Sequence, residues 1–471
     1  MTTLGANQSP TKSRFRLSSL VGHRALAIAF ILLALTFGGS SRADVFSPTI
    51  LRLAAIPLLC VAIWRLTEHG FDRGAIWPSL TLAALAVVAL VQLVPLPPSI
   101  WTRLPGHELA TETYRTIGMS APWLPASMVP DATWNSLFSL IPPSAMFMAT
   151  LTLDAAGRRS LLTAVLFVAV LAVILGMFQI LGGPDSTLRP YAITNPDSAV
   201  GFFANRNHQA SFLLVSVPVA AWWTMLGNPN GNSKISAAHI VGLALVAVLV
   251  VGMVITRSRT AVVLGLASVM LSVLLVYRTG ASERRGRRGL LFGAVAGVAI
   301  ALIAVFSIGP TLDRFTNAPA QERWSLTPTL ERIALDYSPL GSGLGSFERV
   351  YQQYERVEQL GPSYWNHAHD DFMEIWIDTG WFGVLMVASG VFWFLTRSLD
   401  LWRDGRPGEA WRDLGRVGTI VIALLALHSL GDYPLRTPAL ATLFALCCAL
   451  MVAPRGPADR PTPPRPAARR A

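Results

Sequence analysis

The stretch NHAHDDFMEIWIDTGWFGVLMVASGVFWFL, residues 366–395, joins two kinds of sequence that are seldom neighbours. Its first part carries two histidines and four acidic residues, and the part from Thr379 onward has no charged residue. The apolar part continues for about the thickness of a membrane, which is typical of a transmembrane helix. We therefore predict a membrane-spanning helix over 374–396 that has titratable side chains at one end.

The rest of the chain repeats this apolar pattern. Hydrophobic residues make up 52% of the 471 residues and charged residues only 14%, whereas soluble proteins carry about a quarter charged residues. Each long apolar run must be a helix, because the lipid interior offers the backbone no water to bond. We predict an all-α, polytopic membrane helical bundle with about twelve transmembrane helices. The predicted spans are 24–40, 48–64, 76–96, 136–153, 160–182, 208–226, 238–256, 260–277, 289–308, 374–396, 417–431 and 439–453.

Basic residues orient this bundle. If the chain starts in the cytoplasm, most of its 38 lysines and arginines fall in the tails and loops of the cytoplasmic side, as the positive-inside rule requires. The net charge of +11 is therefore an orientation signal and not a nucleic-acid footprint. An uncleaved first span is favoured over a signal peptide, because eleven spans follow it. The predicted parts are a cytoplasmic tail (1–23), the bundle (24–453), a partly helical periplasmic loop between spans nine and ten (309–373) and a disordered Pro/Arg-rich tail (454–471).

Two arginines lie in a short turn on the predicted outer side. Arg257 and Arg259, in the sequence TRSRT, separate spans seven and eight. Arginines at a helix end need water, a partner or an anion. They could be interfacial anchors, but such anchors concentrate on the other side here, so we favour a functional role. Arg323 is a weaker candidate, and the glycine-rich segment 339–347 is interpreted as a structural turn rather than a phosphate-binding nest.

The histidine segment allows two interpretations. His367, His369, Asp370 and Asp371 include the ligand types of a zinc or other divalent site. The outer segments offer no further ligand cluster, however, since His208 and Asp432 are isolated in the sequence. We therefore favour a histidine that acts as a general acid or base beside carboxylates that orient it.

Three acidic residues of the next helix share one face. Asp371, Glu374 and Asp378 have the spacing i, i+3 and i+7. Glu374 and Asp378 enter the membrane, so we expect these two to face the bundle interior or a water-filled cleft. Gly380 and Gly383 are expected to allow close contact between helices. Arginines suit a phosphate-bearing ligand and the histidine suits proton transfer, so these residues favour a transferase that acts on a lipid-linked phosphate.

At these positions the sequence resembles the O-antigen ligase and polymerase family of bacterial membrane glycosyltransferases. His369 is followed by Asp370, nine further residues and Gly380-Trp-Phe-Gly383, which fits the family spacing, although the family usually has Asn, Ser or Gln after the histidine. The resemblance extends to Ser258-Arg259-Thr260, to Phe203–Asn207, to Arg323 and to Leu430–Arg436, and it is strongest over 200–450.

The resemblance implies a multi-pass transferase of the bacterial inner membrane with a periplasmic active face. Such proteins move a glycan from an undecaprenyl-pyrophosphate carrier to lipid A–core or to another glycan, without a cofactor, a metal or a nucleic acid. The arginines would bind the pyrophosphate, and the histidine would deprotonate the acceptor or help to position the donor phosphate. The residues so implied are His369, Arg259 and Arg323 for catalysis and Arg257, Asn207, Asp370 and His367 for substrate binding.

Other functions stay open at the level of the sequence. A polymerase would use the same residues as a ligase. A twelve-span secondary transporter could use Glu374 and Asp378 as proton relays, but the chain has no sign of paired halves. A non-catalytic scaffold has no support in the sequence.

Overall fold

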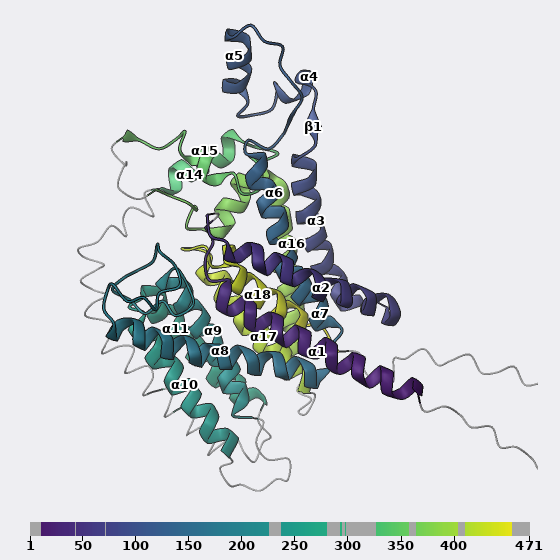
Figure 1. The fold of residues 1–471 in the computed structure, drawn as a ribbon, viewed down its shortest axis with the longest axis vertical. Coiled ribbons are helices and arrows are strands. Elements are labelled where there is room, and N and C mark those ends of the chain that lie inside the picture. Colours follow the sequence, from purple (N-terminus) through teal and green to yellow (C-terminus); the bar gives the residue numbers. More distant parts are fainter. Residues whose placement is uncertain are drawn as a thin grey trace, which may run out of the picture.

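The computed structural model describes residues 11–42, 44–70, 72–225, 237–279, 326–357, 364–403 and 410–454, together with positions 293 and 297. This part of the chain is mainly helical (Figure 1). Its one named sheet is a short antiparallel pair, β1 (Pro95–Leu96) and β2 (Leu124–Pro125). The prediction of an all-α fold is thereby confirmed for the described residues, apart from this short pair.

The α-helices are α1 (Thr11–Phe37), α2 (Ser47–His69), α3 (Ile76–Gln92), α4 (Pro98–Trp101), α5 (Glu108–Thr116), α6 (Pro130–Ser139), α7 (Ile141–Leu151), α8 (Ala155–Leu181), α9 (Arg206–Trp223), α10 (Ala237–Ile255), α11 (Arg259–Thr279), α14 (Thr327–Asp336), α15 (Phe347–Tyr351), α16 (Asp371–Arg403), α17 (Ala410–His428) and α18 (Pro438–Leu450). Two 3₁₀ turns are η1 (Arg73–Ala75) and η4 (Pro434–Arg436).

Six of the described helices are long and apolar enough to cross a membrane: α2, α3, α8, α10, α11 and α16. Helices lie at eleven of the twelve predicted positions, and the ninth, 289–308, falls outside the described residues apart from 293 and 297. The count of twelve, the loop 309–373 and the limits of the two tails therefore stay predictions. The predicted span 136–153 is divided into α6 and α7, because Pro142 and Pro143 lack the N–H groups that would continue a helix.

The predicted span 374–396 is a kinked helix. Within α16, Gly380 has φ 60° and ψ −147°, far from helical values. A side chain there would collide with the backbone of Pro339 and Gly341. At Gly383 a side chain would meet Thr379 and Ile375 of its own helix. The expectation that both glycines serve contact between helices is therefore not met: Gly380 allows close contact with the turn at Pro339 and Gly341, and Gly383 makes room within α16 itself.

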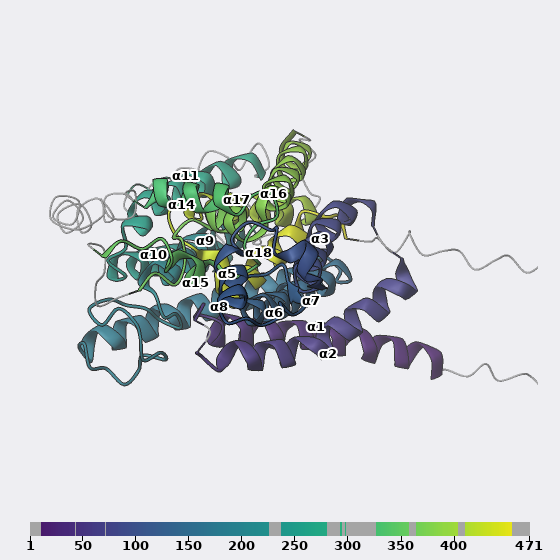
Figure 2. The same cartoon turned by 90° about the horizontal axis from the view of Figure 1, so that it is seen from above.

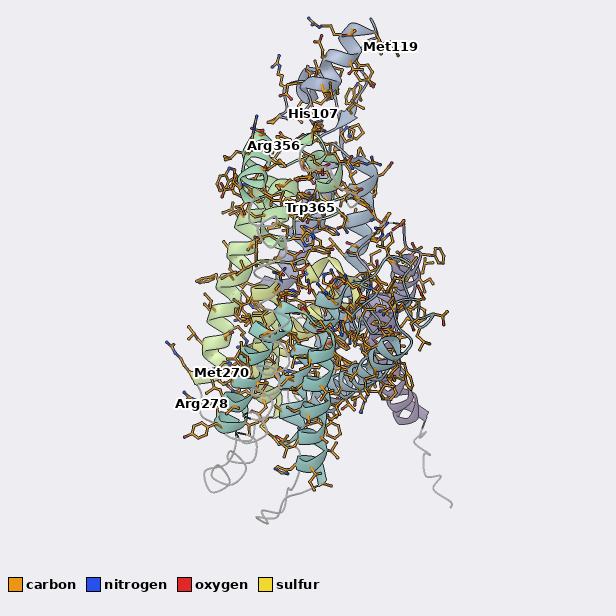
Figure 3. All side chains as sticks on the ribbon, turned by 90° about the vertical axis from the view of Figure 1, so that its left-hand side faces the viewer. His107, Met119, Met270, Arg278, Arg356 and Trp365 are labelled. Carbon is orange, nitrogen blue, oxygen red and sulfur yellow. The ribbon has the colours of Figure 1, made fainter. Side chains whose placement is uncertain are left out.

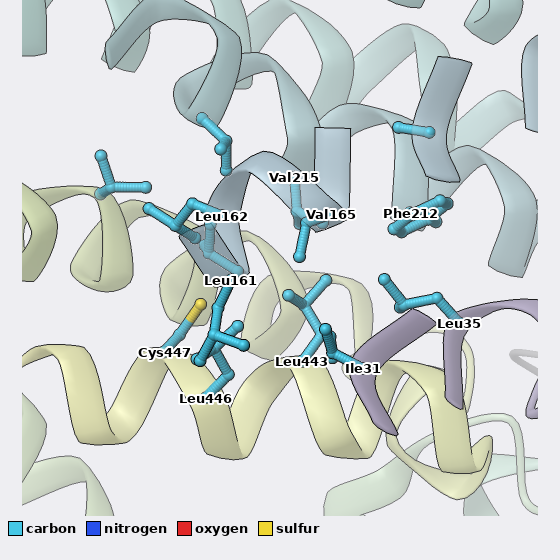
Figure 4. Close-up of a cluster of buried hydrophobic side chains, with 14 of the residues drawn as sticks. Ile31, Leu35, Leu161, Leu162, Val165, Phe212, Val215, Leu443, Leu446 and Cys447 are labelled. Carbon is cyan, nitrogen blue, oxygen red and sulfur yellow. The ribbon is translucent and has the colours of Figure 1, made fainter. Parts of the chain in front are cut away.

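The centre of the bundle is α9, whose residues from His208 to Trp222 are all buried. It packs against α8, α10, α11 and α17, and α1 and α2 lie side by side along one edge (Figure 2). Helices α3 and α16, by contrast, bury little of their apolar surface, as expected of helices that face lipid. The core joins side chains that are far apart in the chain (Figure 4), among them Ile31, Val165, Phe212 and Leu443.

Helix ends gather at one end of the bundle, here called the site end. Ala204 N donates to Gly39 O at 3.0 Å and Ala199 N to Ile255 O at 3.3 Å, which ties the ends of α1, α10 and α9 together. Asp371 N donates to Ser429 O at 3.0 Å, which joins α16 to the end of α17.

The opposite end carries basic residues that were predicted to be cytoplasmic. Buried Arg158 donates to the carbonyl oxygens of Ala449 and Val452 at 3.3 and 2.5 Å. Arg278, at the end of α11, lies far from Trp365 of the site end (Figure 3). Arginines therefore satisfy helix carbonyl groups at this end.

Candidate functional site

The histidine segment reaches α16 through a sharp turn. His369 has φ +54°, in the left-handed region that residues with a side chain seldom adopt. Asp370 then caps the helix, since its Oδ1 accepts from Phe372 N at 2.9 Å and Met373 N at 3.0 Å. Asp and Asn are equally good at a helix N-cap. This explains why an acid can stand where the family usually has an amide.

A buried carboxylate, Asp432, lies at the centre of three histidines. Its Oδ1 is 3.6 Å from His369 Nδ1 and 3.6 Å from His208 Nε2, and its Oδ2 is 3.8 Å from His428 Nε2. Asp432 is 1% exposed. The expectation that His208 and Asp432 are isolated is therefore wrong, because α9, α17 and the start of α16 bring them together.

Asp432 is held as an ionised group. Burial by itself would raise the pKa of Asp432, but its contacts with His208 and His369 outweigh burial and hold that pKa well below its ordinary value. Asn207 Nδ2 donates to its Oδ2 at 2.8 Å and Tyr433 N to its Oδ1 at 2.9 Å. A carboxylate in this position stabilises positive charge on the imidazoles around it.

The arginine turn is linked to the same centre. Ser258 Oγ donates to Asn207 Oδ1 at 2.8 Å, so Asn207 connects the turn between α10 and α11 with Asp432. Arg257, exposed, and Arg259, half-buried at the start of α11, flank Ser258. Arg257 has φ +53° and, with His369, makes up the non-glycine residues of positive φ in the described chain. Backbone strain of this kind concentrates at functional sites.

Aromatic rings surround the histidines. The ring of Tyr433 lies 4.4 Å from that of His367, 4.7 Å from that of His369 and 5.0 Å from that of His208. Trp365 meets His369 edge-on with 5.2 Å between ring centres. Contacts on two sides limit the orientations that the His369 ring can take.

The three predicted acidic residues meet a single arginine. The guanidinium of Arg436 lies 3.4 Å from Asp371 Oδ1, 3.5 Å from Glu374 Oε1 and 3.6 Å from Asp378 Oδ2. The expectation that Glu374 and Asp378 face the interior is confirmed, since both are buried, and Asp371 is buried as well. His367 Nδ1 lies 2.8 Å from Glu374 Oε1, so His367 joins this cluster. Arg436 therefore joins the three carboxylates in one buried ion-pair network.

The glycine-rich segment supports α16. Gly343 N donates to Asp378 O and Gly345 N to Asp378 Oδ2, at 2.9 and 2.8 Å. Leu344 N donates to Gln92 Oε1 at 2.9 Å, and Ser342 N to Ile377 O at 2.9 Å. Because these N–H groups bond within the protein, the segment is a structural turn that secures the kink.

The structure brings most of the predicted site residues together. His369 and Asn207 contact Asp432, the arginine turn is linked to it through Ser258 and Asn207, and His367 and Asp370 adjoin His369. Arg323 lies outside the described residues. In the part of the chain that is described, no group of three or more His, Cys, Asp or Glu side chains is arranged to hold a metal ion. The absence of a metal or cofactor from the reaction stays a prediction.

Sequence reasoning missed Asp432, His208, His428 and Arg436 as members of the site. One signal was present, because His428 and Asp432 are four residues apart at the end of a predicted span. Titratable side chains are uncommon there unless they have a partner. The identity of the partners, however, depends on which helices pack together.

Comparison with known proteins agrees with the resemblance seen in the sequence. Residues 242–388, about a third of the chain, match the family described as O-antigen ligase. The matched part includes the arginine turn, Arg323 and the whole stretch from His367 to Gly383. No curated protein matches the chain. The match confirms the similarity to the O-antigen ligase and polymerase family.

Proposed function

We propose that this membrane protein, similar to O-antigen ligases over residues 242–388, is a glycosyltransferase of the bacterial inner membrane. It moves a glycan from an undecaprenyl-pyrophosphate carrier to an acceptor at the periplasmic face. One observation carries the proposal: His369 and Asn207 both contact the buried carboxylate of Asp432, and Asn207 links this carboxylate to Ser258 of the arginine turn. The lipid carrier remains in the bilayer beside the bundle while its phosphates reach the site end.

The chemistry that suits this site is displacement at a sugar carbon. The acceptor hydroxyl oxygen forms a bond to the anomeric carbon of the donor glycan, and the bond from that carbon to the pyrophosphate oxygen breaks, with inversion. His369 takes the proton of the hydroxyl group. Asp432, 3.6 Å from His369 Nδ1, stabilises the imidazolium that forms.

The leaving group requires positive charge. Pyrophosphate gains negative charge as it departs, and guanidinium groups offer paired donors that match phosphate oxygens. We assign this role to Arg259, with Arg257 beside it and Arg323 as a further candidate. Asn207 binds the substrate or fixes the turn through Ser258. The contacts of His367 with Glu374 and of Asp370 with α16 favour positioning roles for those two residues.

The favoured acceptor is lipid A–core, which makes the protein a ligase. A polymerase, which joins two lipid-linked glycans, uses the same chemistry. Both differ from a transporter in that a covalent product forms, and neither involves nucleic acid or a metal cofactor.

The test is the lipopolysaccharide banding pattern of a deletion strain complemented with wild type, His369→Ala or Arg259→Ala. A bare core with glycan accumulating on its carrier indicates a ligase, and a core with a single repeat unit indicates a polymerase. Arg349→Ala, which removes an exposed arginine of α15, is the matched control. A normal ladder from well-inserted His369→Ala protein would refute the proposal.

A further inference from the structure

One five-residue segment, 432–436, contacts both polar clusters at the site end. Its first residue, Asp432, faces three histidines, and its last, Arg436, faces three carboxylates. Tyr433 lies between them and places its ring against His367 and His369. The two clusters are therefore joined through a short piece of backbone.

The carboxylates that Arg436 faces need a cation. The side chains of Asp371, Glu374 and Asp378 are 9%, 1% and 0% exposed. All three belong to the first two or three turns of α16, before the kink at Gly380. Like charges this close and this well buried repel one another and lose their hydration. Arg436 offsets this repulsion because it reaches all three.

Arg436 is poorly suited to bind substrate phosphate. Its side chain is 19% exposed, but three carboxylates surround its guanidinium, so the local charge is negative and repels an anion. Arg436 is therefore better suited to hold these carboxylates in place than to bind pyrophosphate.

A chain of contacts leads from Arg436 to His369. Glu374 pairs with Arg436 through Oε1, which also lies 2.8 Å from His367 Nδ1. Its Oε2 accepts from Ala368 N at 2.9 Å. Glu374 thus holds the two residues directly before His369, whose backbone is in the left-handed region. A shift of this carboxylate would move the histidine away from Asp432.

We propose that Arg436 is a positioning residue, which fixes Glu374 and the start of α16 and thereby holds His369 in line with Asp432. The inference rests on the proposed function for its kinetic test. A displacement of about 1 Å at a reacting group lowers a rate by as much as about 100-fold. Loss of Arg436 should accordingly lower kcat and leave donor binding nearly unchanged.

The experiment uses the full-length protein in proteoliposomes with a lipid-pyrophosphate-linked glycan and a lipid A–core acceptor. Arg436→Met should lower kcat by about 30-fold to about 100-fold, with the donor KM within about threefold of wild type. Arg436→Lys, which keeps the charge, should recover part of the rate. Arg436→Met with Asp378→Asn should also recover part, because an amide oxygen still accepts from Gly345 N while one unpaired charge is removed.

Two kinetic outcomes would overturn the positioning role. If Arg436→Met raised the donor KM more than about tenfold at unchanged kcat, Arg436 would bind substrate. If the double variant were no faster than Arg436→Met, the charge argument would fail.

Hydrogen exchange of the peptide 364–380 separates this inference from the proposed function. Exchange should rise in Arg436→Met and fall again in the double variant, whatever reaction the protein catalyses. Unchanged exchange in Arg436→Met would refute the positioning role. A wild-type protein that transfers no glycan under these conditions would instead count against the proposed function.

Discussion

Replacing Asp432 with Asn should slow the reaction strongly while the protein still inserts. The change keeps the size of the side chain and removes its charge. The oxygen can still accept from Tyr433 N, whereas the new amide meets the amide of Asn207. The main expected loss is the electrostatic stabilisation of a protonated His369.

The magnitude follows from the distance between the two groups. A carboxylate and an imidazolium 3.6 Å apart attract by about 4.6 kcal/mol at an effective dielectric constant of about 20. A proton half transferred in the transition state would feel about half of this energy. Since each 1.36 kcal/mol is a factor of ten, kcat should fall by about 50-fold to about 2,500-fold.

The assay is the rate of glycan transfer in proteoliposomes as a function of pH. Because the pKa of Asp432 is held well below its ordinary value by His208 and His369 against the effect of burial, the carboxylate stays ionised over the working range. The acid limb of the profile then reports the imidazole. Loss of the carboxylate disfavours imidazolium, so this limb should move to lower pH in Asp432→Asn.

A double variant that exchanges the side chains at positions 432 and 207 is the control for packing. Asp432→Asn combined with Asn207→Asp restores a donor opposite an acceptor but moves the charge away from its place among the histidines. The swap should recover thermal stability and not the rate. Asp400→Asn, which removes an exposed carboxylate at 69% exposure, should change neither. An Asp432→Asn protein within threefold of wild type would refute the reasoning.

Three further predictions concern the fold and its orientation. Asp370→Asn should keep the cap of α16 and near-normal stability, whereas Asp370→Ala should lower the free energy of unfolding by about 1 kcal/mol, measured by thermal unfolding in detergent. Gly380→Ala should destabilise the protein by at least about 1 to 3 kcal/mol because of its positive φ and its contact with Pro339, while Gly390→Ala, in open space on the same helix, should be neutral or stabilising. A cysteine at Arg259, in a chain whose exposed Cys60 is replaced, should react with an impermeant reagent from the periplasm only, and labelling from the cytoplasm alone would reverse the predicted orientation.

The sequence by itself determined where most helices lie. A lipid interior forces the backbone of each apolar run to bond within itself, and this constraint needs no knowledge of neighbours. Local chemistry also identified the histidine segment, the acidic face of α16 and the arginine turn. Titratable side chains at the end of a membrane span are uncommon unless they have a partner or a function. The division into α6 and α7 could also be predicted from the sequence, because Pro142 and Pro143 lack the N–H groups that a continuous helix needs.

Only the tertiary structure decided which of these groups meet. The residues next to Asp432 and His208 in the sequence do not reveal whether these two side chains face headgroup water or each other. The packing of α9 against α17 decides between the two. The kink of α16 is likewise not local, since it depends on the backbone of Pro339 lying against Gly380. Hydropathy is a property of one segment, whereas the partner of a buried charge is fixed by side-chain packing between segments.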